Sequence, residues 1–378
     1  MAYDLILKGG HVVDASQNID AVMDVAFAGG KVAAVGASLE ASAGTSVRNV
    51  AGNYVTPGLI DLHTHVYWGG TSIGVDAEML SRAGAVATHV DAGTAGPANI
   101  MGFRKHVIER SAVRIVPYLN IAFPGIYAFS KTVMVGECLD LRLLSTRDCA
   151  KAARDHADLV CGLKVRIGDG TSGEHGIGPL EMAIDVAEEV GLPVMCHIGA
   201  PPAGRRDVMT RLRKGDVLTH CFRPFPNAPV RVDGKIHDDV LEARARGVIF
   251  DVGHGAGSFG FRTSKGMLAA GFEPDVISSD IHVLSIEGPC FDLLTTMSKF
   301  LCLGMSLANV IRATTTAPAA AIRRPELGTL KPGAVGEASV LDFKQGRFEY
   351  LDVIGEKIEG ERRLAAAGLV LNGRWWHP

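Results

Sequence analysis

The sequence predicts an α/β protein in which a (β/α)8 barrel is joined to a small β-sandwich domain built from both ends of the chain. Three observations support this: eight apolar runs rich in β-branched residues, helix-like stretches between them, and glycine-rich β-like segments at the two ends. Apolar strands that alternate with helices are typical of a parallel sheet covered on both faces. Such a barrel needs about 250 residues, and the chain has 378.

The two ends of the chain have the pattern of short strands joined by tight turns. Residues 3–15 (YDLILKGGHVVDA) and 24–37 (DVAFAGGKVAAVGA) each place alternating apolar residues around a Gly-Gly pair, which predicts β-hairpins. The C-terminal runs GEASVLDF and GLVLNGRWW are also β-like. We therefore expect residues 1–54 plus 324–378 to form the small domain and residues 55–323 to form the barrel.

Eight candidate barrel strands follow one another along the chain. They lie in residues 54–66, 85–94, 113–122, 161–167, 192–199, 216–222, 247–255 and 275–282. Helix-like segments separate several of them, such as PLEMAIDVAEEVG after the fourth and VLEARARG after the sixth. An open doubly wound sheet is the competing fold, but the loop HTHVYWGGTS after the first strand lacks its G-x-G-x-x-G phosphate-binding pattern.

The composition is that of a soluble globular protein. The net charge is −3, from 38 basic and 41 acidic side chains without a long run of one sign, which argues against nucleic-acid and membrane partners. Asp4 and Lys8 interrupt the apolar core that a signal peptide would need. The seven cysteines form no C-x-x-C pair, so we expect free thiols and a cytoplasmic location. Whether the chain forms a homo-oligomer stays open.

Polar side chains stand at the carboxyl ends of the predicted strands, where catalytic groups lie in barrels of this type. His63 and His65 close the first strand, in the stretch GLIDLHTHV. Because strand side chains alternate between faces, the two imidazoles point to the same side and can converge on one cation. Considered alone, this H-x-H pattern fits two hydrogen-bonded core histidines equally well.

Four further polar residues stand at the same predicted rim. His197 and His220 close the fifth and sixth strands, and four buried imidazoles without partners would be expensive. A neutral imidazole binds one ion, so a two-metal site needs an anionic bridge. Lys164, which ends the fourth strand, could supply this bridge after reaction with CO₂, because burial favours the neutral amine. Asp280, in the eighth strand, is a carboxylate that could bind a metal and transfer a proton. Considered alone, Lys164 could instead be a structural lysine in a salt bridge, and Asp280 could instead be the N-cap of a helix.

With these residues placed, the sequence resembles the binuclear, dihydroorotase-like branch of the amidohydrolase superfamily. The resemblance rests on TPGLIDLHTH, on the later rim residues and on the return segment TTTAPAAAIRRPELGTLKPGAVGEASVLDF, and it covers essentially the whole chain. It implies two divalent ions, which we expect to be zinc. The implied ligands are His63, His65 and Asp280 for the more buried ion, His197 and His220 for the other, and carbamylated Lys164 as the bridge. Asp280 would also be the catalytic residue that moves the proton.

The resemblance implies a hydrolase of an amide or ester bond, and we expect it to remove a small acyl group, such as acetyl, from a carboxylate-bearing N- or O-acyl substrate. A cyclic-amide hydrolase, like dihydroorotase or hydantoinase, is the alternative, although dihydroorotases carry an arginine where this chain has Tyr67. A deaminase is less expected, because CHIGAPPAG lacks the glutamate that deaminases need near the fifth-strand histidine. A catalytically inactive scaffold is also less expected, because all six ligands are present.

Four polar side chains are candidate substrate contacts in a pocket that we expect to be mostly apolar, with one cation for a carboxylate. They are Lys131, Arg166, Arg223 and His254. One of them would bind a substrate carboxylate. Ordinary solvation or structural pairing stays an open alternative for each.

Overall fold

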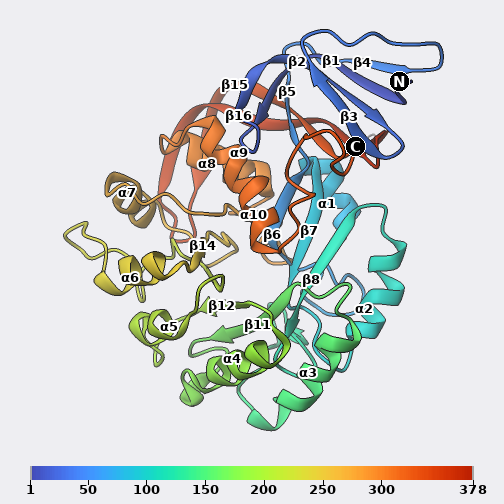
Figure 1. Cartoon of the computed structure of the whole chain (residues 1–378). Coiled ribbons are helices and arrows are strands. Elements are labelled where there is room, and N and C mark those ends of the chain that lie inside the picture. Colours follow the sequence, from blue (N-terminus) through green and yellow to red (C-terminus); the bar gives the residue numbers. More distant parts are fainter. Residues whose placement is uncertain (1, 377–378) are drawn as a thin grey trace.

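The computed structural model describes residues 2–376, and its centre is a barrel of parallel strands (Figure 1). Within these residues seven strands form one sheet in the order β14-β13-β12-β11-β8-β7-β6. Their bounds are β6 (Leu59–Thr64), β7 (Val86–Ala92), β8 (Arg114–Asn120), β11 (Gly162–Ile167), β12 (Val194–Ile198), β13 (Val217–Thr219) and β14 (Ile249–Asp251). The predicted fold class is confirmed, and so are seven of its eight barrel strands.

The eighth predicted strand, residues 275–282, is not a regular strand. It forms one isolated parallel bridge to each neighbour, Val276 with Asp251 and Ile281 with Thr64. The ladder is interrupted because Asp280 adopts a left-handed backbone conformation, with φ 49°. The segment nevertheless joins the two edges of the sheet, since the amide of Asp280 donates to the carbonyl of His63 at 2.7 Å. Residues 275–282 therefore close the barrel between β14 and β6, with Asp280 held beside His63.

Helices cover the outside of the barrel (Figure 1). They are α1 (Ala77–Gly84), α2 (Ile100–His106), α3 (Thr146–Asp155), α4 (Gly178–Val190), α5 (Arg205–Arg211), α6 (Asp238–Arg246), α7 (Phe261–Ala269), α8 (Leu293–Cys302), α9 (Leu307–Thr314) and α10 (Thr316–Ala321). Short 3₁₀ turns lie at Ile108–Arg110, Leu141–Leu143 and Gly173–His175. The helix-like segments predicted after the fourth and sixth strands correspond to α4 and α6, and both end at a left-handed glycine, Gly191 and Gly247, the usual residue for stopping a helix.

Both ends of the chain contribute to a second sheet, whose order is β17-β16-β15-β5-β1-β2-β3, with β4 paired to β1. The strands are β1 (Leu5–Asp14), β2 (Ile19–Ala28), β3 (Lys31–Gly36), β4 (Ser46–Asn49), β5 (Tyr54–Pro57), β15 (Ala338–Leu351), β16 (Lys357–Leu371) and β17 (Arg374–Trp376). Its buried core includes Phe27, Val55 and Val340. The sheet fixes the start of the barrel, because β5 passes directly into β6 through Gly58.

One of the two N-terminal hairpins is not where the Gly-Gly pattern predicts it. Gly29 and Gly30 do form the turn between β2 and β3, but Gly9 and Gly10 lie inside β1, where the register of pairing with β2 shifts. A side chain at Gly10 would collide with Val55, 2.5 Å from its Cγ2. This Gly-Gly pair is therefore a bulge that lets β5 approach β1, rather than a turn.

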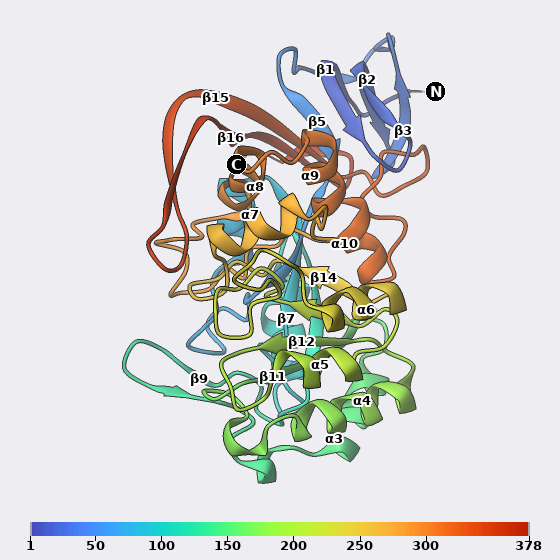
Figure 2. The same ribbon diagram turned by 90° about the vertical axis from the view of Figure 1, so that its left-hand side faces the viewer.

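The long hairpin β15–β16 extends from the terminal sheet along the side of the barrel (Figure 2). It contacts α8, where the amide of Leu364 donates to the hydroxyl of Ser298 at 3.0 Å.

All seven cysteines are free thiols and six are buried. No helix within residues 2–376 is long and apolar enough to cross a membrane.

Candidate metal centre

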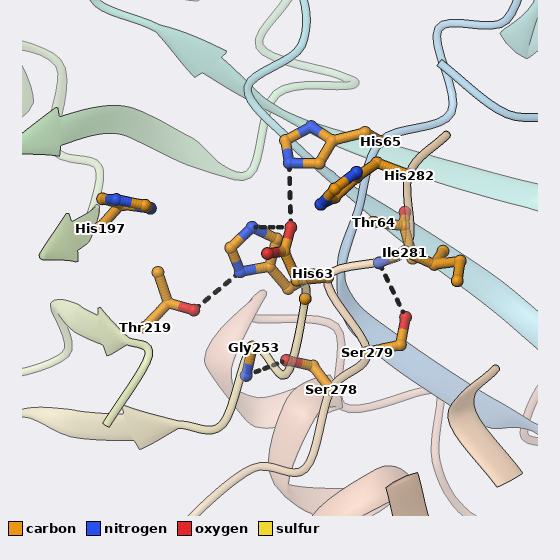
Figure 3. Close-up of polar contacts among 12 residues, drawn as sticks. His63, Thr64, His65, His197, Thr219, Gly253, Ser278, Ser279, Ile281 and His282 are labelled. Carbon is orange, nitrogen blue, oxygen red and sulfur yellow. Dashed lines mark hydrogen bonds and ion pairs between the residues drawn. The ribbon is translucent and has the colours of Figure 1, made fainter. Parts of the chain in front are cut away.

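Three residues from the first and last barrel segments converge at the carboxyl end of the strands (Figure 3). Oδ1 of Asp280 lies 3.2 Å from Nε2 of His63 and 3.2 Å from Nε2 of His65. All three side chains are buried, and their ligand atoms lie within 4.8 Å of one another. The two histidines point the same way because they are two residues apart in an extended chain.

The other three predicted ligands lie beside this group. Nδ1 of His197, on β12, is 2.6 Å from Nε2 of His220, which follows β13. Nζ of Lys164, on β11, is 3.5 Å from Nε2 of His63. The rings of His63 and His220 have centroids 5.2 Å apart. The structure thus brings all six residues predicted as ligands into one buried cluster, which we call the rim cluster: His63, His65, Lys164, His197, His220 and Asp280.

Neighbouring oxygen atoms fix the tautomer of two histidines. The hydroxyl of Thr219 donates to Asp251 at 2.7 Å, so it accepts from Nδ1 of His63, which is also 2.7 Å away. Nδ1 of His220 donates to the carbonyl of Gly253 at 2.7 Å. In both rings the proton is on Nδ1, so Nε2 presents a lone pair to the rim cluster. This arrangement is the usual outer support of metal-binding histidines.

His65 has the same kind of support. Its Nδ1 lies 2.8 Å from the hydroxyl of Thr94, and the amide of Thr94 is itself held by the carboxylate of Asp91 at 2.7 Å. Nε2 of His65 faces Asp280. The lone pair of His63, a second imidazole nitrogen and a carboxylate oxygen that face one another are the donor set of a cation, so the residues present fit a metal.

Burial sets the protonation of the four histidines and of Lys164 in the direction that metal binding needs. It lowers the pKa of His63, His197 and His220 well below the ordinary value, and it lowers the pKa of His65 to about 3. The imidazoles are therefore neutral. Burial also lowers the pKa of Lys164 to about 8, which makes a neutral amine accessible near neutral pH.

Glycines that sequence reasoning did not single out form the walls of the rim cluster. A Cβ atom at Gly253 would lie 2.3 Å from Oγ1 of Thr219, one at Gly255 would lie 2.2 Å from Oδ2 of Asp280, and one at Gly93 would lie 2.3 Å from Cβ of Lys164. All three glycines have positive φ. The pattern VGHG in the seventh strand was the available signal, since glycine in a strand marks a close backbone approach.

His282 is a further residue that sequence reasoning missed, although its spacing from Asp280 repeats that of the H-x-H pair. Its Nδ1 accepts the amide proton of Leu284 at 3.1 Å, so the ring proton of the neutral form is on Nε2. The ring lies near His65, with centroids 6.1 Å apart, and meets the ring of Phe129 edge-on at 5.2 Å. His282 thus adds a fixed N–H donor beside the rim cluster (Figure 3).

Phe129 belongs to a small hairpin in the segment after β8. Its strands are β9 (Ala128–Phe129) and β10 (Met134–Val135). The backbone of Phe129 is hydrogen-bonded to Ser72, in the loop after β6. Lys131 is exposed in the turn of this hairpin.

The other three residues predicted to contact substrate are buried but differ in their partners. Arg166 forms a two-pronged ion pair with Glu137, at 2.8 and 2.6 Å. Nε2 of His254 accepts a hydrogen bond from Nζ of Lys299 at 2.7 Å. Arg223 follows His220 by three residues, and within residues 2–376 it has no acidic partner.

A parallel barrel with buried histidines and an aspartate that converge at the carboxyl ends of its strands is typical of metal-dependent hydrolases. The model of the amidohydrolase family matches residues 54–375, and the chain belongs to this family of hydrolases. The sequence is 35% identical to a deacetylase of Agrobacterium fabrum, over 86% of this chain and 80% of that protein. It is 32% identical to a deacetylase of Enterococcus faecalis, over 91% of each.

Solved structures share the entire architecture. The crystal structure of an adenine deaminase superposes with a TM-score of 0.91 at 30% identity, covering 99% of both chains. The crystal structure of a dihydroorotase superposes with a TM-score of 0.90 at 32% identity, covering 100% of this chain and 99% of that one.

Proposed function

We propose that this hydrolase removes a small acyl group, such as acetyl, from a nitrogen or oxygen of a small molecule with the help of two divalent ions, which we expect to be zinc. The observation that carries this proposal is the convergence of Asp280 with His63 and His65, in which the ring of His63 is held as the Nδ1–H tautomer. Relatives named deacetylases, which match most of the chain, support the choice of an acyl group. The free cysteines are compatible with a cytoplasmic enzyme.

Each member of the rim cluster has a role in this proposal. His63, His65 and Asp280 would hold one ion, and His197 and His220 would hold the other. Lys164, as a carbamate, would supply one oxygen to each. The ions would lower the pKa of a water molecule and polarise the scissile carbonyl.

Asp280 is the residue of this chain that would move the proton. It would accept a proton from the attacking water and deliver it to the departing nitrogen or oxygen. Burial raises the pKa of Asp280 to about 6, whereas a bound cation would favour the ionised carboxylate, the form that accepts the proton. Nε2–H of His282 would hold a substrate oxygen next to this carboxyl group.

Hydrolysis of a cyclic amide is the second candidate, favoured by the dihydroorotase structure. It would use the same cluster, but Tyr67 does not provide the cation that a dihydroorotase carries at this position. The ring of Tyr67 stacks on Phe103 with centroids 4.5 Å apart, outside any ion pair within residues 2–376. Deamination is disfavoured, because residues 198–204 contain no glutamate and Lys164 is present.

A substrate panel tests the proposal. The panel contains N-acetyl and O-acetyl compounds, dihydroorotate, hydantoin and adenine. We expect hydrolysis of the acetyl compounds, and we expect Asp280→Asn to lower kcat by at least about 100-fold while the protein still binds metal. Turnover of dihydroorotate or adenine without acetyl hydrolysis would contradict the proposal.

A further inference from the structure

Arg223 is a buried arginine whose charge is not balanced by an acidic group within residues 2–376. Only 9% of its surface is exposed. Its Nε donates to the carbonyl of Pro226 at 3.0 Å, and its Nη1 donates to the carbonyl of Ile198. Within the described chain Nη2 has no partner. Two neutral carbonyls therefore fix the guanidinium group and leave one edge of it unused.

The guanidinium group of Arg223 lies beside the end of β12, the strand that carries His197. Ile198, whose carbonyl it contacts, directly follows His197. The backbone of Arg223 is also fixed relative to His220, because its amide donates to the carbonyl of His220 at 3.2 Å.

A buried cation without a counter-charge is unfavourable, because desolvation is not offset by an ion pair. Burial accordingly lowers the pKa of Arg223. Other arginines with little exposure are compensated, since Arg166 pairs with Glu137 and Arg205 pairs with Asp239. An anion is the missing partner of Arg223.

The other three residues predicted to contact substrate are less suited to bind that anion. The charge of Arg166 is already balanced by Glu137, Nε2 of His254 is occupied by Lys299, and Lys131 is exposed in a hairpin turn. A single guanidinium group matches the single charge of a carboxylate and binds it through charge-assisted hydrogen bonds.

We propose that Arg223 binds the carboxylate of the substrate, so that the enzyme acts on N-acyl amino acids or O-acyl hydroxy acids with a free carboxylate. This inference rests on the proposed acyl hydrolysis and names the substrate class. Arg223 is then the specificity-determining residue, and the acyl carbonyl lies at the rim cluster while the carboxylate lies on the side of His197 and His220.

The test compares each acetylated acid with its uncharged carboxamide. We expect kcat/KM of the wild type to be about 10- to 100-fold higher for the acid than for its carboxamide, because a hydrogen bond between charged groups contributes that much to binding. Arg223→Met should remove most of this preference, because it should raise KM for the acid much more than KM for the carboxamide. Arg223→Lys should retain part of the preference. Arg206→Met, on the exposed surface of α5, is the matched control and should behave like the wild type.

Three possible results would contradict different parts of this proposal. Equal loss of activity on the acid and the carboxamide in both Arg223 variants, with circular dichroism unchanged, would show a structural role and overturn the inference. A wild type that hydrolyses both compounds equally would overturn the inference while leaving acyl hydrolysis intact. Failure of the wild type to hydrolyse any acetyl compound would instead overturn the proposed function.

Discussion

The backbone of Gly255 forms the wall against which the carboxylate of Asp280 rests. A Cβ atom at position 255 would lie 2.2 Å from Oδ2 of Asp280 and 3.1 Å from its Cγ. The amide of Gly255 also donates to the carbonyl of Ser279 at 2.8 Å, so the two segments cannot move apart freely. The position of Asp280, the proposed proton carrier, therefore depends on the absence of a side chain at Gly255.

Gly255→Ala should displace Asp280 from His63 and His65. We expect a loss of kcat of about 100-fold or more, because misplacing a reacting group by about 1 Å is costly, together with a destabilisation of about 1–3 kcal/mol from the positive φ. Gly257→Ala is the matched control in the same loop, since a Cβ atom there would contact nothing within 4 Å. Steady-state kinetics and thermal unfolding of both variants check this. Equal kinetics for the two variants would contradict it.

Thr219→Val should weaken metal binding without removing a ligand. The substitution keeps the shape of the side chain but removes the oxygen that accepts the Nδ1 proton of His63. We expect the metal affinity to fall about 10- to 100-fold, as is typical when an outer partner of a metal-binding histidine is lost. Competition with a chelator measures this affinity. Thr210→Val, on α5, is the control, and an unchanged affinity in Thr219→Val would show that the tautomer of His63 is fixed by other means.

Lys299 should make the stability of the protein depend on pH above neutrality. Its Nζ donates to His254 and to the carbonyls of Pro289 and Leu351, each at 2.7 Å, and burial lowers its pKa from 10.5 to about 8. Between pH 8 and 10.5 the unfolded chain therefore binds more protons at this residue than the folded chain, so the free energy of unfolding rises with pH.

The comparison of wild type with Lys299→Met isolates this effect. The free energy of unfolding of the wild type minus that of the variant should increase by about 2–4 kcal/mol from pH 7.5 to 10.5. Urea unfolding at several pH values measures it. Lys265→Met, an exposed lysine on α7, should show no such trend. A difference that is flat or falls with pH would mean that Lys299 is not destabilised by burial of its charge.

Much of the fold could be predicted because the barrel strands are local apolar runs and the helices are local amphipathic segments. The exceptions share one cause, which is contact with distant residues. Gly9 and Gly10 have the local pattern of a turn, but the approach of Val55 decides that they form a bulge. The segment at Asp280 has a strand pattern, but its hydrogen bonds to β6 force a positive φ.

The same division applies to the site. The side chains of the rim cluster stand out in the sequence because charged and imidazole groups are rare in apolar strands. Their outer partners do not stand out, since a threonine such as Thr219 is an ordinary strand residue until His63 is found beside it. The distinction between Arg166 and Arg223 is also not visible in the sequence, because it depends on Glu137, which comes from a different segment.

The central claim is that the rim cluster holds two ions. Metal analysis of the purified wild type and of Lys164→Ala tests this claim most directly. Elemental analysis after removal of loosely bound metal should give close to two divalent ions per wild-type chain. Lys164→Ala should lose at least one of them and its activity, and short carboxylates such as formate should restore part of both. A wild type that carries no tightly bound divalent ion, or a Lys164→Ala variant with two ions and undiminished activity, would contradict the account.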